Sequence, residues 1–316
     1  MKNSGLLAPQ YQDGDEARGH IEKIRWPDGP VCPHCGVINE ASKVNPRPKS
    51  KKPVRKGVWW CRACEKQFTV TVGTIFEDSH IPLHKWLLAI HLMLSSKKGI
   101  SAHQLMRNLG IGSYRSAWFM SHRIRWALTQ DPVKGLFNGT VEMDETYVGG
   151  KLRTGSQAVK PGERPQDRLA GTANKMAVVS VLQRGGSVRS YPVARVTAKN
   201  LKPIVNEMVA DDAHLMTDTS TVLASAGAKR KHSQVNHSAK EYVRMENGEM
   251  ISTNTVEGYF SILKRGNYGV YHHWSRKYMP HYLREFDWRY NVRNVSDIER
   301  TVIALKMTGG KRLFLK

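Results

Sequence analysis

The chain has 316 residues, of which 40% are hydrophobic, so it can bury a substantial core and is not a disordered tail. Its 49 lysines and arginines exceed its 27 aspartates and glutamates by 22, and this surplus predicts a polyanionic partner, nucleic acid before an anionic membrane. The sequence contains neither an apolar run that could span a bilayer nor a secretory signal, so we expect no membrane segment and a location in the reducing cytosol.

Changes in composition divide the chain into four expected domains. A polar helical segment (1–25) precedes a segment with all four cysteines (26–76), and a helical region follows (77–132). The last domain (133–316) has a mixed α/β pattern. Its expected strands cover 140–148, 176–182, 188–196 and 214–217, its expected helices cover 198–209, 254–264 and 282–292, and 222–250 is expected to be irregular.

The cysteines form two matching motifs. Cys32 and Cys35 are followed by Gly36, and Cys61 and Cys64 repeat the Cys-x2-Cys spacing after 25 intervening residues. Each motif turns the backbone so that two thiolates face one ion, and two such turns complete a closed tetrahedral site. The spacing therefore predicts structural Zn²⁺; the alternative, four unligated cysteines, leaves the paired spacing unexplained.

The insert between the two cysteine motifs is strongly cationic. Residues 43–56 contain seven lysines and arginines, three prolines and no acid. This composition predicts a basic loop presented by the zinc module. Lys51 and Lys52 near its centre are candidates for contacts with DNA phosphates.

A pair of short helices follows in the helical region. Residues 101–110, a tight turn at 111–113 and a second helix at 114–128 have the pattern of a helix-turn-helix. The polar side of the second helix carries Arg115 and His122, which would contact DNA if this is a recognition helix. An ordinary helical hairpin with a basic solvated face fits the pattern equally well.

Acids in the last domain form the main catalytic candidate. Asp144 lies inside a strand and shares a strand face with Glu142, and Asp218 ends a second strand. Asn254 and Glu257, three residues apart, share a face of the helix that follows. Two aspartates on strands and one acid on a helix can hold two Mg²⁺ or Mn²⁺ ions about a phosphate. The alternative is that each acid is a solvated surface charge.

Several longer motifs occur in a characteristic order. They are Trp-Pro-Asp-Gly-Pro-Val-Cys-Pro-His-Cys-Gly at 26–36, Met-Asp-Glu-Thr-Tyr-Val-Gly-Gly at 143–150, Thr-Asp at 217–218, Val-Asn-His-Ser-Ala-Lys-Glu-Tyr-Val at 235–243, and 253–266, which opens with Thr-Asn-Thr-Val-Glu and closes with Leu-Lys-Arg-Gly. Over nearly the whole chain this order resembles the DDE-type transposases of the IS1595 (ISXO2-like) family. The resemblance implies a zinc ribbon before an RNase H-like catalytic core, which cuts and joins double-stranded DNA at terminal inverted repeats with a divalent metal.

By position in these motifs, the resemblance implies that Asp144 and Asp218 are the first two metal ligands. The third ligand is open between two residues. Asn254 follows Asp218 after 35 residues, and Glu257 precedes Lys264 by six intervening residues; both are familiar spacings. We favour Glu257, because a carboxylate binds Mg²⁺ more strongly than an amide does, and Asn254 would then be an auxiliary ligand or support a ligand.

The residues around these acids complete the expected site. The resemblance implies that Lys264 and Arg265 contact DNA phosphate. His237 would orient a phosphate or a water molecule, or else pack its own loop. Thr219 and Ser220 follow Asp218 where we expect glycine and an aromatic residue, which is a departure from the family pattern.

The leading hypothesis is an insertion-sequence transposase associated with the nucleoid, which acts as a homodimer or larger assembly on transposon ends and target DNA. A DNA-binding regulator or domesticated copy without catalysis is the alternative. A nuclease or resolvase of the same fold, which cleaves without joining, is a third possibility.

Overall fold

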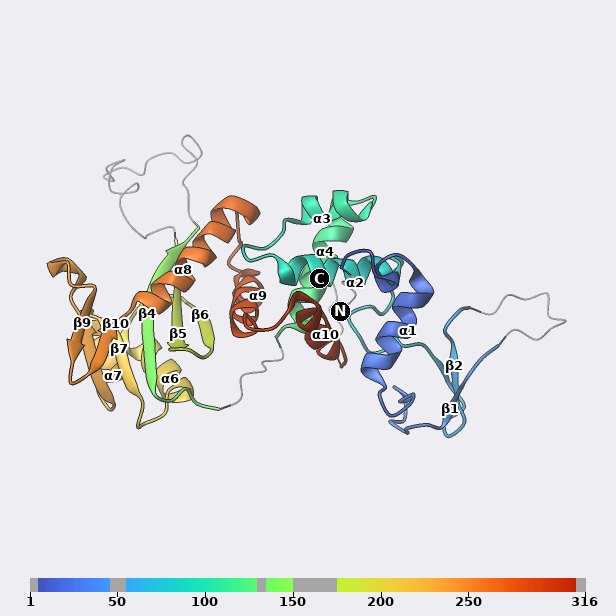
Figure 1. Cartoon of the computed structure of the whole chain (residues 1–316), viewed down its shortest axis with the longest axis horizontal. Coiled ribbons are helices and arrows are strands. Elements are labelled where there is room, and N and C mark those ends of the chain that lie inside the picture. The colour runs from blue at the N-terminus through green and yellow to red at the C-terminus, as the bar shows by residue number, and fades with distance from the viewer. Residues whose placement is uncertain (1–4, 46–54, 130–134, 150–174, 311–316) are drawn as a thin grey trace, which may run out of the picture. The chain divides into compact units, whose positions relative to one another are not determined.

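The computed structural model describes residues 5–45, 55–129, 135–149 and 175–310, and the chain divides into two compact units (Figure 1). Met1–Gln130 with Asn294–Lys316 form what we call the cysteine unit, and Asp131–Arg293 form what we call the sheet unit. The division after residue 130 lies near the boundary expected at 132/133. The C-terminal end differs from the expectation of one domain over 133–316, because the last helix belongs to the cysteine unit.

The cysteine unit is built around a helix that is apolar on almost every side. Its helices are η1 (Pro9–Tyr11), α1 (Gly14–Arg25), α2 (Leu83–Ser95), α3 (Ala102–Leu109), α4 (Tyr114–Ala127) and α10 (Asp297–Lys306). Helix α2 buries Trp86, Ile90 and Met93 among others, and it packs against α1 and α10. A helix without a polar face must be covered all round. This requirement explains why the C-terminal helix packs in the unit that contains the cysteines.

A small sheet carries part of the cysteine motif. Strands β1 (Ala41–Lys43), β2 (Trp59–Cys61) and β3 (Gln67–Phe68) form a three-stranded antiparallel sheet in that order. Trp26 lies edge-to-face against both Trp59 and Phe68, with 5.8 Å between ring centroids in each pair. These aromatic contacts anchor the sheet to the end of α1, whereas Trp60 points outward and is 37% exposed.

Helices α3 and α4 lie where the sequence predicts them. The Ser101 side chain accepts a hydrogen bond from the backbone N–H of Gln104 and so caps the start of α3. Gly110 ends the helix with φ of +57°, a left-handed conformation that glycine adopts without strain. Helix α4 begins directly after Ser113, so the connection between the two helices is short.

The sheet unit contains a five-stranded mixed sheet of order β6-β5-β4-β7-β8. The five strands are β4 (Thr140–Val148), β5 (Met176–Gln183), β6 (Val188–Val193), β7 (His214–Asp218) and β8 (Lys231–Val235). Strand β4 pairs antiparallel with β5, which pairs antiparallel with β6, and β4 and β8 each pair parallel with β7. Gly185, at φ +74°, turns β5 into β6, as the hairpin expected there requires.

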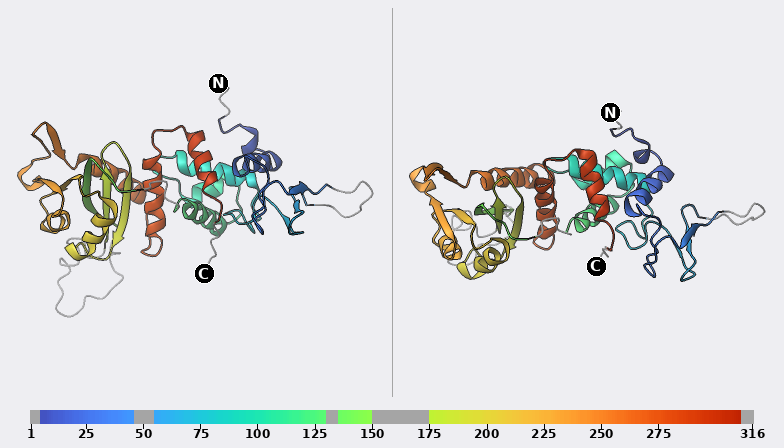
Figure 2. Two further views of the ribbon diagram at one scale, coloured as in Figure 1. Left: turned by 90° about the horizontal axis from the view of Figure 1, so that it is seen from below. Right: turned by 60° about the horizontal axis from the view of Figure 1, so that its bottom comes forward.

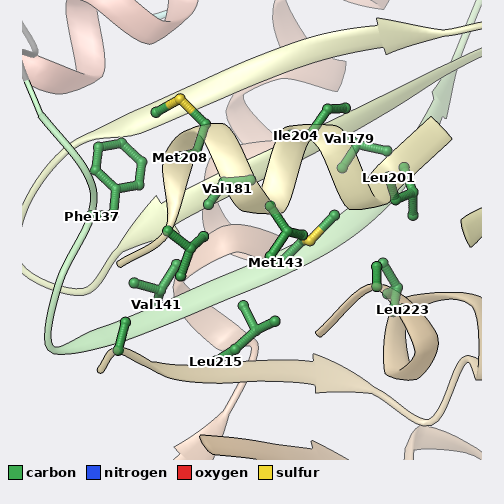
Figure 3. Packing of buried hydrophobic residues seen from close by; sticks show 14 residues of the cluster. Phe137, Val141, Met143, Val179, Val181, Leu201, Ile204, Met208, Leu215 and Leu223 are labelled. Atoms are coloured by element: carbon green, nitrogen blue, oxygen red, sulfur yellow. The ribbon is translucent and has the colours of Figure 1, made fainter. Parts of the chain in front are cut away.

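Helices cover both faces of this sheet (Figure 2). The covering helices are α6 (Ala198–Met208), α7 (Thr221–Gly227), α8 (Asn254–Gly266) and α9 (Met279–Asn291), with the short η2 (His237–Ala239) and the π-helical η3 (Asn267–Tyr271). Val141 and Met143 of β4 pack against α6 and α7 (Figure 3), while Val148 packs against α8 and α9. Because side chains alternate along a strand, Glu142 and Asp144 face the α8 side.

The segment 222–250 is more ordered than the sequence indicates. It contains all of α7 but its first residue, the edge strand β8, and most of a hairpin of β9 (Val243–Glu246) and β10 (Glu249–Ser252) that leads into α8. Strand β8 reads Lys-His-Ser-Gln-Val, which lacks the apolar alternation by which strands are recognised, because it lies at the sheet edge. Within the described residues, none of the helices is long and apolar enough to cross a bilayer.

Candidate zinc site and carboxylate site

The four cysteines converge on one point. Their sulfur atoms all lie within 4.8 Å of one another, with 3.6 Å between Cys32 and Cys64 and 3.7 Å between Cys35 and Cys61. Four sulfurs about 2.3 Å from a tetrahedral Zn²⁺ would lie about 3.8 Å apart, so the donors fit this ion. The cluster supports the structural Zn²⁺ predicted from the sequence.

The electrostatics of the thiols also favour a cation. Burial disfavours ionisation of Cys32, but backbone N–H groups of Cys35 and His34 directed at its sulfur lower its pKa to about 6. Burial and the neighbouring sulfurs raise the pKa of Cys64 to about 12. Cys32 therefore ionises more readily than Cys35 and Cys64, whose pKa values are raised, and a bound divalent cation would favour the thiolate form of each.

The two cysteine turns have the same backbone geometry. The N–H of Gly36 donates to the carbonyl of Cys32, and the N–H of Glu65 donates in the same way to Cys61. Both donors adopt positive φ, +78° for Gly36 and +55° for Glu65. The second turn thus places an ordinary L-residue where glycine is favoured, at a conformational cost.

In the sheet unit, Asp144 and Asp218 lie level with each other on adjacent parallel strands. Glu142 of β4 pairs with Met216 of β7, and the two aspartates are each two residues further on, just past the last paired residues. The side chains of paired residues point to the same face of a sheet, so both carboxylates face α8. Ser220 donates its backbone N–H to Asp218 Oδ1 over 3.0 Å, which forms the local turn without the expected glycine.

Electrostatic coupling brings a third predicted acid into this group. Burial, followed by the negative charges of Glu145, Asp218 and Glu257, raises the pKa of Asp144 to about 7, although the N–H of Glu145 donates to Asp144 Oδ1 over 2.7 Å. Burial and Asp218 also raise the pKa of Glu145. Among the described residues, three or more ligand atoms come within 4.8 Å of one another only at the cysteines, so the acids form a more open group.

Glu257 is held from two sides. Its Oε1 accepts a hydrogen bond from the buried Thr253 hydroxyl over 3.1 Å and lies 3.0 Å from His237 Nε2. The same His237 nitrogen is 3.1 Å from Thr253 Oγ1, which closes a three-membered network. His237, expected to orient a phosphate, water or its own loop, therefore contacts the candidate third ligand.

The other predicted residues of α8 are exposed. Asn254 is the first residue of the helix, and Lys264 and Arg265 lie in its last turn. Glu257 and Lys264 are seven residues apart and so lie about two turns apart on the same side of the helix. The solvent can therefore reach both candidates for the third ligand and both candidates for phosphate contact.

A residue that sequence reasoning did not select stands out. Glu142 is fully buried, and its carboxylate accepts hydrogen bonds from the backbone N–H groups of Thr255 and Val256, both over 2.9 Å. The Thr255 hydroxyl and Arg184 also bind it. The signal in the sequence was an acid among apolar strand residues on the same face as Asp144.

The predicted DNA contacts of α4 need a correction. Arg115 is exposed, as expected, but His122 is only 2% exposed, and so is Arg125 one turn further along the helix. The His122 ring lies 4.2 Å from that of Trp118. Every residue from 120 to 125 is buried, so the polar stripe expected on this helix is covered by packing. His122 is therefore not available to contact DNA from a solvated face.

Lys51 and Lys52 lie outside the described residues. A cavity of about 320 Å³ lies next to residues 43–45 and 55–58, which flank this segment in the sequence. Its charged lining residues are four cations and one acid: Arg18, Lys43, Arg55, Lys56 and Asp15. The base of the cationic loop is thus predominantly positive, which suits a phosphate backbone.

The described chain combines a four-cysteine module of the zinc-binding class with a mixed α/β unit that carries Asp144 and Asp218 on adjacent strands, and comparisons with known proteins give its family. Residues 12–67 match the transposase zinc-ribbon domain and residues 136–291 match the ISXO2-like transposase domain. The chain belongs to the IS1595 family of transposases. It is 25% identical over 288 residues to an uncharacterised protein in transposable element ISH50 of Halobacterium salinarum, covering 86% of this chain and 89% of that one. No solved structure matches it.

Proposed function

We propose that this transposase binds the terminal inverted repeats of an insertion sequence and catalyses metal-dependent cleavage and strand transfer of DNA. The observation that carries the proposal is the level position of Asp144 and Asp218 on adjacent parallel strands, with Glu257 close enough to perturb Asp144. Family membership supports the same conclusion.

The sheet supports an RNase H-like core. Its central strand β4 pairs antiparallel with β5, the next strand in the chain. After β6 and helix α6 the chain returns as β7, which pairs parallel with β4 on its other side. The first acid lies on β4 and the second at the end of β7. This is the arrangement that the resemblance to DDE transposases implies.

Divalent cations fit the acids of this core. Asp144, Asp218 and Glu257 offer carboxylate oxygens, the ligands that Mg²⁺ and Mn²⁺ prefer, and Asn254 adds an exposed amide beside them. Burial first, and then the negative charges of its neighbours, raise the pKa of Asp144, and a cation would balance these charges. Such ions would activate the attacking oxygen and stabilise the leaving oxygen.

The chain's own groups would supply orientation and charge. Water would first displace the 3′-oxygen at the transposon end, and the freed 3′-hydroxyl would then attack a phosphate of the target, releasing the target's own 3′-oxygen without a covalent enzyme intermediate. Lys264 and Arg265, beyond Glu257 on α8, would hold the DNA backbone there. Hydrogen bonds from Thr253 and His237 would keep Glu257 aimed at Asp144.

The cysteine unit would recognise the transposon ends. Its basic cavity at the cationic loop and the α3–α4 pair with exposed Arg115 provide positive surface, and Zn²⁺ would hold the ribbon that carries the loop. Since transposition joins two ends, we expect a homodimer or larger assembly on DNA, located at the nucleoid.

A strand-transfer assay with the element's end sequence tests the proposal. Asp144→Ala and Asp218→Ala should each lower joining by roughly 10²–10³-fold or more, the range found when one essential stabilising group of an active site is removed. Asp211→Ala is the control, because this 95%-exposed carboxylate, which pairs with Arg230, precedes β7 at the end of the strand opposite Asp218; it should leave joining unchanged. Unchanged joining in both active-site variants, with no Mn²⁺ binding by calorimetry, would favour a DNA-binding regulator. Cleavage without joining would favour a nuclease or resolvase.

A further inference from the structure

Helix α8 is capped by the sheet and not by its own N-terminal residues. The N-cap residue Thr253 makes no side-chain capping bond. The N–H groups of Thr255 and Val256, which have no partner within the helix, instead donate to Oε2 of Glu142, 113 and 114 residues earlier in the chain. A carboxylate at this position also opposes the positive end of the helix dipole.

Arg184 completes the anchor. Its Nε and Nη2 lie 2.9 and 2.8 Å from Glu142 Oε1, and its Nη1 donates to the carbonyl of Met250 over 2.8 Å. Met250 lies on β10, the strand that leads into α8, and Arg184 also reaches Ser252 at its end. One guanidinium therefore ties together the end of β5, the buried acid of β4 and the chain that enters α8.

This network joins the two halves of the proposed metal site. Glu142 is two residues before Asp144 on the same strand face, and its partner Val256 directly precedes Glu257. The Glu142 carboxylate thus bonds the strand that carries the first acid to the helix start that carries the third. Both its oxygens are occupied by at least two donors each, so Glu142 is not itself a candidate ligand.

We propose that Glu142, held by Arg184, is a positioning residue that sets the start of α8 so that Glu257 and Asn254 face Asp144. This inference rests on the proposed metal-dependent function. Its consequence is that the metal affinity of the carboxylates depends on a residue that contacts no metal, as supporting partners of metal ligands commonly do.

Mn²⁺ calorimetry on the zinc-loaded full chain tests this role. Glu142→Gln keeps the size of the side chain but turns an amide N–H₂ group or an uncharged oxygen toward Arg184, so the anchor loosens. Mn²⁺ affinity should fall by about 10- to 100-fold, the loss typical when a partner of a ligand is removed. Thr255→Val, which deletes only the hydroxyl bond to Glu142, is the milder variant and should lower the affinity less, in a chain that stays folded.

Tyr259→Phe is the matched control for simple destabilisation. It removes a hydrogen bond of 2.6 Å from the same helix to buried Asp287, one turn beyond the capped end. It should lower the melting temperature without changing Mn²⁺ affinity. If Glu142→Gln and Thr255→Val lower stability but bind Mn²⁺ like the wild-type chain, the positioning role is wrong.

The inference and the proposed function fail in different ways. If the wild-type chain binds Mn²⁺ no better than Asp144→Ala does, the proposed metal site is wrong. Amide hydrogen exchange still tests the anchor in that case, because Glu142→Gln should speed exchange at Thr255 and Val256 and Tyr259→Phe should not. Unchanged exchange at both amides would overturn the anchor itself.

Discussion

His237 Nε2 lies 3.0 Å from Glu257 Oε1, and the buried Thr253 hydroxyl donates to the same oxygen. Replacing the imidazole by the amide in His237→Gln removes a contact that orients the candidate third ligand but leaves every acid in place. Strand transfer should fall by about tenfold or more at limiting Mn²⁺. Saturating Mn²⁺ should recover part of the loss. A variant as active as the wild type at limiting Mn²⁺ would remove His237 from the site.

The buried hydrogen-bonded group of Tyr259, Ser190 and Asp287 should make stability depend on pH. Burial raises the pKa of Asp287 to about 6, despite hydrogen bonds from Ser190 and Tyr259. A raised folded-state pKa means that the folded state binds the proton more tightly, so this stabilisation is complete at low pH and lost as pH rises through about 6. Because the pKa of Asp287 lies about two units above its usual value, the loss of folding free energy between low and high pH is about 3 kcal/mol.

Urea unfolding of the wild type and Asp287→Asn at about pH 4 and about pH 7 measures this effect. The variant cannot ionise at this position, so its stability relative to the wild type should improve by up to about 3 kcal/mol at the higher pH. A difference that is the same at both pH values would contradict the raised pKa.

Zinc removal should affect the cysteine unit selectively. Cys61→Ser takes one sulfur from the tetrahedral cluster, and a small zinc module without its metal loses most of its folding energy. We expect fluorescence of Trp26 and Trp59 to shift to longer wavelength while the sheet unit keeps its melting transition. The wild-type chain should contain one Zn²⁺ by atomic absorption. Unaltered ribbon fluorescence in the variant would argue against a structural metal.

The two cysteine turns predict opposite effects of exchanging glycine. Gly36→Ala forces a side chain into φ of +78° and should cost about 1–2 kcal/mol, although no atom lies within 4 Å of the added carbon. Glu65→Gly relieves the same strain at φ +55°, offset in part by the greater freedom of glycine in the unfolded chain. Zinc retention against a competing chelator should rank Glu65→Gly at or above the wild type and Gly36→Ala below it.

The cationic loop should determine the salt dependence of DNA binding. Replacing Lys51 and Lys52 by glutamine should make the fall of log affinity with log salt less steep by up to about 2. Each lysine that neutralises a DNA phosphate contributes about 0.9 to the magnitude of this slope. Lys199→Gln with Lys202→Gln on α6 removes the same charge from an exposed helix of the sheet unit and should change the slope little. Equal slopes for both double variants would mean that the loop does not contact DNA.

The sequence by itself determined the features that depend on neighbours along the chain. Cysteine pairs separated by two residues specify a metal turn. The pattern of 140–148 predicts a strand that carries Asp144 inside it, and 214–217 predicts a strand that runs into Asp218. The start of α8 near Asn254 follows from helical periodicity. The zinc ribbon and the transposase family follow from such local motifs, and the comparisons confirm both.

Tertiary structure decided what depends on partners far away in the chain. His122 looked solvated because periodicity shows which face is polar but not what covers it. The C-terminal helix joined the cysteine unit, where Thr301 lies 3.0 Å from His91, 210 residues earlier. Glu142 could be recognised as the cap of α8 only when a strand and a helix more than a hundred residues apart were packed together. Burial and hydrogen bonding between distant segments are properties of the packed chain, and local sequence does not encode them one residue at a time.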